Sequence, residues 1–328
     1  MPVTTSLMAL GTLPPDHELN IGMLGMHGAR YTNCIIDECD VLFAIGARFD
    51  DRATGKAAAF APRARIVHID IDAREFGKIK QPTLAIQASA HDALTALLER
   101  VPHLERRTWL ERVTHLRTRY PLSTPRSNEL CTPYGIVRTV ATLASPQCIV
   151  TTDVGQHQMW VAQAFPFENP HNWLTSGGLG TMGFGLPAAI GAALAAPQAT
   201  VLCFTGDGSL LMNIQELATL AELDLNVKII LLDNAALGLV RQQQQLFYAK
   251  SFVASMYSGA TNFVAIARAF GVTSHDLGRC DSPQQVLHDT LNRSGPALIR
   301  VPIEAHELVL PMVAPGSANT EALTEVTT

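Results

Sequence analysis

The sequence predicts an α/β protein made of two doubly wound parallel-sheet domains. Strand and helix signals alternate early in the chain, where apolar runs at 41–47 and 65–72 precede a helical pattern at 92–101. In the later part, further apolar strands are expected near Cys148, Val201, Val227 and Ala297. The 328 residues are 47% hydrophobic and 16% charged, which is enough for two separate cores.

Composition also divides the chain into segments. We expect a first domain over 1–102, a linker over 103–132, a second domain over 133–316 and a loose C-terminal tail over 317–328. The linker is rich in Arg, Glu, Pro and Ser. Its charged run from Glu105 to Arg107 is typical of a solvent-exposed helix face rather than a binding patch.

Charge, cysteine use and hydropathy exclude several classes of protein. A net charge of −5 argues against a nucleic-acid surface. The six cysteines lack paired metal-binding spacing, and buried thiols in the reducing cytoplasm account for them most simply. The first arginine is Arg30, so we expect no secretory signal. The uncharged stretch 173–206 holds an apolar helical core at 183–196 that is too short to cross a membrane.

A metal site is predicted where two apolar strands end. Asp207, in the turn Gly206-Asp207-Gly208-Ser209, offers a carboxylate oxygen, Asn234 an amide oxygen and Ala236 a carbonyl, all suited to Mg²⁺. A helical pattern at 212–223 joins the two strands, so both ends reach one edge of a parallel sheet, where ligands bind. Taken alone, Gly-Asp-Gly is more typical of a simple turn.

Two further motifs favour the metal site over the turn. They are DVGQHQMW, from Asp153 to Trp160, and SGGLGTMGFGLP, from Ser176 to Pro187. In this order the motifs resemble the diphosphate-binding domain of thiamine diphosphate enzymes, and specifically the large catalytic subunit of acetolactate synthase (acetohydroxyacid synthase). The resemblance runs nearly end to end, through 22–28, 46–52, 68–72 and 310–319, and the segment 237–244 is most like isozyme I.

This resemblance implies the roles of the motif residues. Asp207, Asn234 and Ala236 would hold Mg²⁺, and the diphosphate would be approached by Gln156, His157, Gly206, Gly208 and Ser209. Met182 would support the bent cofactor, and the Gly180 carbonyl would face its 4′-amino group. The cofactor would decarboxylate pyruvate and pass two carbons to pyruvate or 2-oxobutanoate, the first common step of branched-chain amino-acid biosynthesis. Without the family, Met182 is simply a core residue and His157 a structural histidine.

Substrate choice is implied to depend on Arg52 and Gln243, and Leu239 is a further implied catalytic residue. The Arg52 guanidinium suits the carboxylate of the acceptor, although an ion pair with Asp50 or Asp51 is the alternative. Many relatives carry Trp where this chain has Gln243, and a methylene in a pocket is worth roughly 1–3 kcal/mol. We therefore expect weak discrimination between pyruvate and 2-oxobutanoate. Asp233 also departs from the Asn-Asn pair of many relatives.

The first domain is implied to bind FAD as a structural cofactor. The implied contacts are Gly25, His27, Gly46, Arg48, Asp70 and Asp72. Without the family these are ordinary glycine turns and strand-end acids, and no complete GxGxxG motif is present.

No segment matches the N-terminal pyrimidine-binding domain, which supplies the catalytic glutamate in this family. General acid–base catalysis contributes about 10²–10⁴-fold, so the isolated chain is expected to be nearly inactive. Two hypotheses remain. The chain is the C-terminal part of an acetolactate synthase that works as a homo-oligomer or with a separate pyrimidine-domain chain, together with a regulatory small subunit; or it is a cofactor-binding remnant that is inactive alone.

Overall fold

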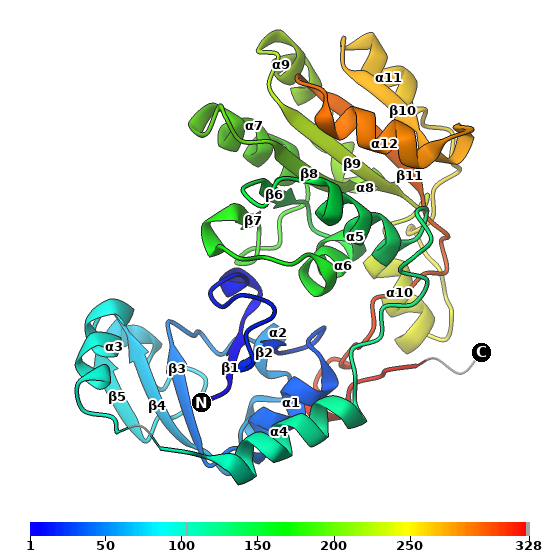
Figure 1. Ribbon diagram of the computed structural model, residues 1–328. Coiled ribbons are helices and arrows are strands. Elements are labelled where there is room, and N and C mark those ends of the chain that lie inside the picture. Colours follow the sequence, from blue (N-terminus) through cyan, green and yellow to red (C-terminus); the bar gives the residue numbers. More distant parts are fainter. Residues whose placement is uncertain (103, 326–328) are drawn as a thin grey trace. The chain divides into compact units, whose positions relative to one another are not determined.

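The computed structural model describes residues 1–102 and 104–325, which form two compact units (Figure 1). The first unit comprises Met1–Ser6, Asp16–Ser123 and the segment from Leu310 onward. The second comprises Leu7–Pro15 and Thr124–Val309. Position 103 of the predicted linker and positions 326–328 of the predicted tail lie outside the described residues.

The first unit contains a three-stranded parallel sheet in the order β3-β4-β5 and a separate parallel pair, β1-β2. The strands are β1 (Val3–Thr5), β2 (Asn20–Met23), β3 (Val41–Ile45), β4 (Arg65–Asp70) and β5 (Leu84–Gln87). The helices are α1 (Arg30–Glu38), α2 (Asp51–Thr54), α3 (Ala90–Leu98) and α4 (Arg107–Arg119), with 3₁₀ turns η2 (Ala57–Ala59), η3 (Ala73–Glu75) and η6 (Asn319–Glu321). The strands predicted at 41–47 and 65–72 and the helix at 92–101 are therefore present with slightly different ends.

Helix α4 falls within the predicted linker, yet one of its faces is buried. Val113 and Leu116 pack with Ile21 and Ile35 in a small apolar core. Arg112 donates to both carboxylate oxygens of Glu38, at 2.7 and 2.6 Å, so an ion pair flanks the apolar contact. The run Glu105–Arg107 is exposed, as its charge pattern predicts.

The predicted loose tail is wrong for the part that the structure describes. Asn319 is buried, and its side-chain amide donates to the carbonyl of Ala53 at 2.8 Å. The carbonyl of Ser317 accepts a 2.9 Å hydrogen bond from the Lys56 amide. The tail looked loose because its residues are small and polar, but backbone and amide hydrogen bonds to distant residues hold it against the first unit.

The core of the first sheet supplies a test of stability. Ile69 on β4 is fully buried, whereas Ile71 just beyond the strand is 72% exposed. We expect Ile69→Ala to lower the free energy of unfolding by about 2–5 kcal/mol, since it removes buried methylenes and leaves a cavity. The matched variant Ile71→Ala should change it by less than about 0.5 kcal/mol. Urea denaturation of both variants measures the difference, and equal effects would contradict the buried position of Ile69.

The second unit is built on a six-stranded, wholly parallel sheet in the order β10-β11-β9-β8-β6-β7. Its strands are β6 (Ile149–Thr152), β7 (Trp173–Thr175), β8 (Val201–Gly206), β9 (Val227–Asp233), β10 (Thr273–Asp276) and β11 (Ala297–Pro302). Its helices are α5 (Pro133–Leu143), α6 (Gln156–Ala164), α7 (Gly185–Ala195), α8 (Asp207–Leu210), α9 (Glu216–Glu222), α10 (Gly238–Phe247), α11 (Phe263–Ala269) and α12 (Pro283–Asn292), with 3₁₀ turns η1 (Leu7–Ala9), η4 (Pro170–Asn172) and η5 (Leu277–Arg279).

Helices cover both faces of this sheet. Every residue of β8 and β9 is buried, as expected of central parallel strands that are covered on both sides. Helices α7, α9 and α11 form one apolar cluster with alternate residues of β8 and β9. Helix α6 packs on β6 and β8 and contacts α5, which in turn contacts α12 (Figure 1). This is the doubly wound arrangement that the sequence predicts.

The helix predicted at 212–223 begins later than expected, because residues 212–215 form a turn. The chain forms the short helix α8 directly after β8, then turns, and begins α9 only at Glu216. At the turn, the side-chain amide of Asn213 donates to the carbonyl of Gly183 at 2.5 Å, a contact that the helical periodicity cannot reveal. Within the described ranges, no helix is both long and apolar enough to span a membrane, and α7 has only 11 residues.

Candidate active site

The carboxyl ends of β6, β8 and β9 meet at a topological switch point of the second sheet. After β6 the chain places β7 on one side, and it then returns to place β8 on the other side of β6. Loops that leave adjacent strands in opposite directions open a crevice at this point, which is where open α/β sheets bind ligands. The three strands lead into Gln156, Asp207 and Asn234 respectively.

Asp207 lies at the start of α8 and is almost fully buried. One carboxylate oxygen accepts the Gly208 amide at 2.7 Å, and the other accepts the Ala236 amide at 3.1 Å. Burial raises the pKa of Asp207 to about 7, and the nearby Asp233 carboxyl adds to the shift. A divalent cation would favour the ionised form of such a carboxylate. The structure thus brings together Asp207 and Ala236, two of the three predicted magnesium ligands.

Asn234 joins the same cluster through its side-chain nitrogen. This nitrogen donates to the Gln156 side-chain oxygen at 3.1 Å, which leaves the amide oxygen of Asn234 to serve as a metal ligand. Gln156 donates in turn to the side chain of Gln242 at 2.9 Å and to the carbonyl of Glu307 at 2.8 Å. The predicted residues Gln156, Asn234 and Asp207 are therefore linked into one region.

Gln242 is a site residue that the sequence reasoning missed. Its side chain is fully buried, and its amide oxygen accepts the hydrogen bond from Gln156. The side-chain amide also donates to the Val309 carbonyl at 2.9 Å and accepts from the Val309 backbone amide at 2.8 Å. It stands in a run of four glutamines at 242–245. Its neighbours in the run are also glutamines, and Gln242 differs from them only in facing the interior of the protein on α10. The amino-acid composition of the run therefore could not single it out.

His157 has an unpaired nitrogen at this edge. The ring is buried, and its Nε2 atom has no hydrogen-bond partner among the described residues. Burial lowers the pKa of His157 to about 4, so the ring is neutral at pH 7. A buried polar atom without a partner is costly. The other ring nitrogen is bonded to the Asp153 backbone, so Nε2 could donate to a diphosphate oxygen only in the protonated ring, a form that an adjacent diphosphate would favour. This observation fits the predicted cofactor.

The glycines of the motif allow close backbone approach. A Cβ atom on Gly206 would lie 2.8 Å from the His157 ring, and one on Gly208 would lie 2.5 Å from the Tyr257 hydroxyl. Ser209 is buried and donates to the carbonyl of Val154 at 3.1 Å. Glycine is therefore required at positions 206 and 208, because the side chains of His157 and Tyr257 leave no room for a Cβ atom.

The remaining predicted residues of the second unit lie on two other segments. Gly180 and Met182 belong to the loop that follows β7, where Gly180 has a φ of +65° and Met182 is half-buried. Leu239 and Gln243 lie four residues apart on α10, and both are half-buried. Residues at this spacing share one face of a helix, so both side chains can contact the same molecule.

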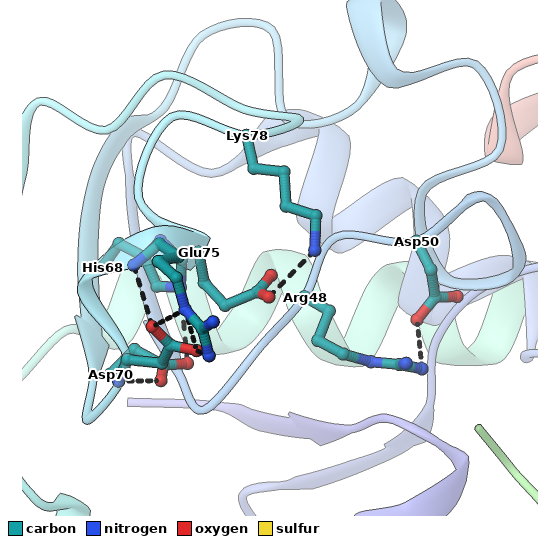
Figure 2. Close-up of polar contacts among 8 residues, drawn as sticks. Arg48, Asp50, His68, Asp70, Glu75 and Lys78 are labelled. Atoms are coloured by element: carbon teal, nitrogen blue, oxygen red, sulfur yellow. Dashed lines mark hydrogen bonds and ion pairs between the residues drawn. The ribbon is translucent and has the colours of Figure 1, made fainter.

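In the first unit, Arg52 and Arg48 form surface ion pairs. Arg52 lies on α2, is mostly exposed and pairs with Asp51 at 3.4 Å. Arg48 turns instead toward Asp50, at 3.2 Å, as Figure 2 shows. The alternative that the sequence left open for Arg52, an ion pair with a neighbouring aspartate, is thus present, and its exposed guanidinium still has donors for an acid.

The predicted flavin residues cluster around turns of the first unit. Gly25 has a φ of +97°, and a Cβ there would lie 2.3 Å from the Arg52 carbonyl, so glycine is required. His27 is buried against the carbonyl of Pro311 at 3.0 Å, and burial lowers its pKa to about 4. Gly46, with a φ of +62°, faces open space, since no atom lies within 4 Å of its Cβ position.

The two strand-end acids of this unit are engaged locally. Asp70 accepts the Asp72 amide at 2.9 Å, and Asp72 binds Arg74 at 2.7 Å, which holds the pKa of Asp72 down to about 2. The sequence reasoning overlooked His68, which is fully buried beside Asp70, its Nε2 4.0 Å from a carboxylate oxygen (Figure 2). Its ring packs edge-on against Phe49 and Phe76, so a histidine occupies a core position of β4.

One cavity lies at the opposite, amino-terminal edge of the second sheet. It measures about 210 Å³ and is lined in part by Lys228, Thr273 and Ala297, which stand at or near the start of their strands. Lys228 is buried, which lowers its pKa to about 8, and it donates to the carbonyls of Arg293 and Gly295. None of the predicted site residues lines this cavity, so the site is defined by its hydrogen-bonded cluster rather than by the cavity.

Comparison with known proteins agrees with the fold. The model of the thiamine pyrophosphate enzyme central domain matches residues 1–97, and that of the C-terminal thiamine pyrophosphate-binding domain matches residues 153–301. The chain belongs to the thiamine pyrophosphate enzymes, and within them it is a homologue of acetolactate synthase large subunits.

The similarity covers nearly all of this chain. It is 55% identical to the acetolactate synthase isozyme 1 large subunit of Escherichia coli K12, over 99% of this chain and 58% of that subunit. It is 42% identical to the isozyme 2 large subunit, over 98% of this chain and 58% of that subunit. The large subunit of Parasynechococcus marenigrum WH8102 is 44% identical, over 98% of this chain and 52% of that subunit. The chain thus spans little more than half the length of these relatives.

Proposed function

We propose that this chain carries the cofactor site of an acetolactate synthase, which transfers a two-carbon unit from pyruvate to pyruvate or 2-oxobutanoate. The observation that supports this most directly is the bonded cluster of Asp207, Ala236, Asn234 and Gln156 at the carboxyl edge of β6, β8 and β9. A buried carboxylate, an amide oxygen and a backbone carbonyl at one sheet edge form a donor set suited to Mg²⁺.

The residues present fit magnesium and thiamine diphosphate. Asp207, Asn234 and the Ala236 carbonyl would hold the metal, while His157 Nε2 would meet a diphosphate oxygen. When bound, thiamine diphosphate supplies the carbon that adds to a 2-keto acid and accepts electrons as CO₂ leaves. Gln242 orients Gln156, and Gln156 orients Asn234, so the chain positions the metal ligand through two buried amides. Gly180 and Met182 would contact the thiamine itself.

Acceptor choice is proposed to involve Arg52, Leu239 and Gln243. Arg52 offers an exposed guanidinium for a carboxylate, and Leu239 and Gln243 share one face of α10. Because Gln243 offers less flat apolar surface than an indole, pyruvate and 2-oxobutanoate should compete on nearly equal terms.

Further partners and location follow from the same proposal. FAD would be a structural cofactor of the first unit, near Gly25, His27, Gly46, Arg48 and the strand-end acids Asp70 and Asp72. The working enzyme would be a homo-oligomer, or an assembly with a chain that supplies a pyrimidine-binding domain, and a regulatory small subunit would bind it. We place this assembly in the cytoplasm.

The test is acetolactate formation from pyruvate by the purified chain with Mg²⁺, thiamine diphosphate and FAD. A parallel reaction adds the part of the Escherichia coli isozyme 1 large subunit that this chain does not match, as a separate polypeptide. We expect activity with that polypeptide and little without it, since proton transfer typically contributes 10²–10⁴-fold. Adding 2-oxobutanoate as a competitor then measures acceptor preference.

Cofactor binding is measured alongside by calorimetry. Cofactor binding without turnover in either reaction would favour the second candidate function, a cofactor-binding chain that is inactive. The hydrogen-bonded cluster would explain the binding, since it contains the proposed cofactor ligands but no catalytic glutamate. If the chain shows no cofactor binding and no turnover, the proposed site is contradicted.

A further inference from the structure

Three charged residues form a network beside the proposed metal site, and the proposed function does not use them. Asp233 ends β9 directly before Asn234, and one of its oxygens accepts the Arg300 Nε at 2.6 Å. Another guanidinium nitrogen of Arg300 donates to both oxygens of Asp276, at 3.1 and 3.0 Å. The three residues come from adjacent strands, in the order β10-β11-β9.

Asp233 also shapes the turn that carries the metal ligands. Its second oxygen accepts a hydrogen bond from the Ala235 amide at 3.3 Å. Ala235 adopts a φ of +52°, a backbone conformation that residues other than glycine rarely adopt. This strained residue lies between Asn234 and Ala236, the two ligands that the turn presents. The orientation of the Asp233 carboxylate therefore influences where both ligands point.

Asp233 further brings a second carboxyl group to the site. It lies near enough to Asp207, the only carboxylate in the proposed metal-ligand set, to add to the effect of burial on the pKa of that group. The side chains of Asp233 and Asp276 are 9% and 16% exposed, and that of Arg300 is 27% exposed, so water screens these charges incompletely. Without a cation beside it, Asp233 would repel the diphosphate that the site is proposed to bind.

We propose that Arg300 is a positioning residue of the magnesium and diphosphate site and acts through Asp233. It compensates the charge of Asp233 and fixes the carboxylate that holds the turn 233–236, so that Asn234 and Ala236 direct their oxygens to the metal. Asp276 holds the other end of the guanidinium and sets its direction. This inference rests on the proposed function, because it assumes that the site binds Mg²⁺ and thiamine diphosphate. It does not depend on which reaction follows.

The test measures affinity for thiamine diphosphate in the presence of Mg²⁺, by calorimetry on the full chain. We expect Arg300→Met to weaken binding about tenfold, because an uncompensated carboxylate then faces the diphosphate. Adding Asp233→Asn to Arg300→Met should restore affinity to within about threefold, since the amide keeps an oxygen for Ala235 and carries no charge. Arg300→Lys should be intermediate, because it keeps the charge but loses the forked geometry.

Arg268→Met is the matched control. Arg268 belongs to the same unit and donates to the Ser274 carbonyl at 3.1 Å, away from Asp233. It should bind thiamine diphosphate like the wild type. Circular dichroism without Mg²⁺ checks that each variant is folded.

Two results would overturn the inference alone. In the first, the wild type binds and Arg300→Met binds equally well. In the second, the double variant stays as weak as Arg300→Met, which would mean that Arg300 supports the fold without acting through the charge of Asp233. A wild-type chain that fails to bind thiamine diphosphate and Mg²⁺ would overturn the proposed cofactor site and the inference together.

Discussion

Asp207→Asn is expected to abolish magnesium-dependent binding of thiamine diphosphate while making the cofactor-free chain more stable above pH 7. Burial holds the pKa of Asp207 at about 7 in the folded chain, against an ordinary value of 3.8. The unfolded chain therefore releases this proton at lower pH than the folded one. The destabilisation begins above about pH 4, grows as the pH rises and is complete above about pH 7.

The asparagine variant escapes this effect, because it keeps an oxygen that can accept from Gly208 or Ala236 and has no charge to bury. The gain should be on the order of a few kcal/mol at pH 8 and close to zero at pH 4. Urea denaturation of both proteins at several pH values measures it. Calorimetry should detect no binding of thiamine diphosphate with Mg²⁺ to the variant.

The comparison must be made as a difference between the two proteins. Burial lowers the pKa of His27 and His157 to about 4, so their contribution to stability is lost as the pH falls from about 6.5 to 4. Both proteins share these histidines, and the opposing trend cancels in the difference. Asp281→Asn, at an exposed aspartate, is the control for replacing a carboxylate by an amide and should change the free energy of unfolding by less than about 0.5 kcal/mol. A wild-type chain as stable as Asp207→Asn at pH 8 would contradict the buried carboxylate.

Gly238→Ala is expected to cause the second large loss of cofactor binding. A Cβ atom on Gly238 would lie 2.0 Å from the Gln156 side-chain oxygen and 2.9 Å from the Asn234 side-chain nitrogen. Gln156 cannot yield without breaking its bonds to Gln242 and to the carbonyl of Glu307. Asn234, the proposed metal ligand, would then be displaced, and cofactor binding should weaken strongly. As a guide to the size of the effect, a misplacement of about 1 Å in an active site typically reduces activity about 100-fold.

Calorimetry with Mg²⁺ and thiamine diphosphate measures this loss. The matched control is Gly191→Ala, since Gly191 lies within α7 and has no atom within 4 Å of its Cβ position. This variant should leave binding unchanged and stabilise the chain by up to about 1 kcal/mol, because alanine favours a helix interior. Equal binding by both glycine variants would show that Gln156 does not hold Asn234 in place.

Much of the second unit was predictable because its central strands have a local signature. The runs at β8 and β9 are apolar on both faces, which is typical of parallel strands that are covered by helices on each side. Polar residues that follow such strands must lie at the carboxyl edge. The positions of Asp207 and Asn234 therefore follow from the order of residues alone.

The errors of prediction share one cause. The helix expected at 212–223 begins only at Glu216, after a turn in which Asn213 contacts Gly183, 30 residues away in sequence. The tail was expected to be loose, but Asn319 bonds to Ala53, 266 residues away. Local periodicity and composition contain no information about such pairs, since both partners are unremarkable in their own segments.

The sequence by itself determined the α/β class, the central strands and the residue types that reach the edge of the second sheet. Apolar periodicity and strand-end motifs are local properties, so they can be read along the chain. Only the tertiary structure decided that Gln242 supports Gln156 and that Arg300 pairs with both Asp233 and Asp276. Those partners lie 86, 67 and 24 residues apart, and burial and charge compensation arise only when the folded sheet brings them together.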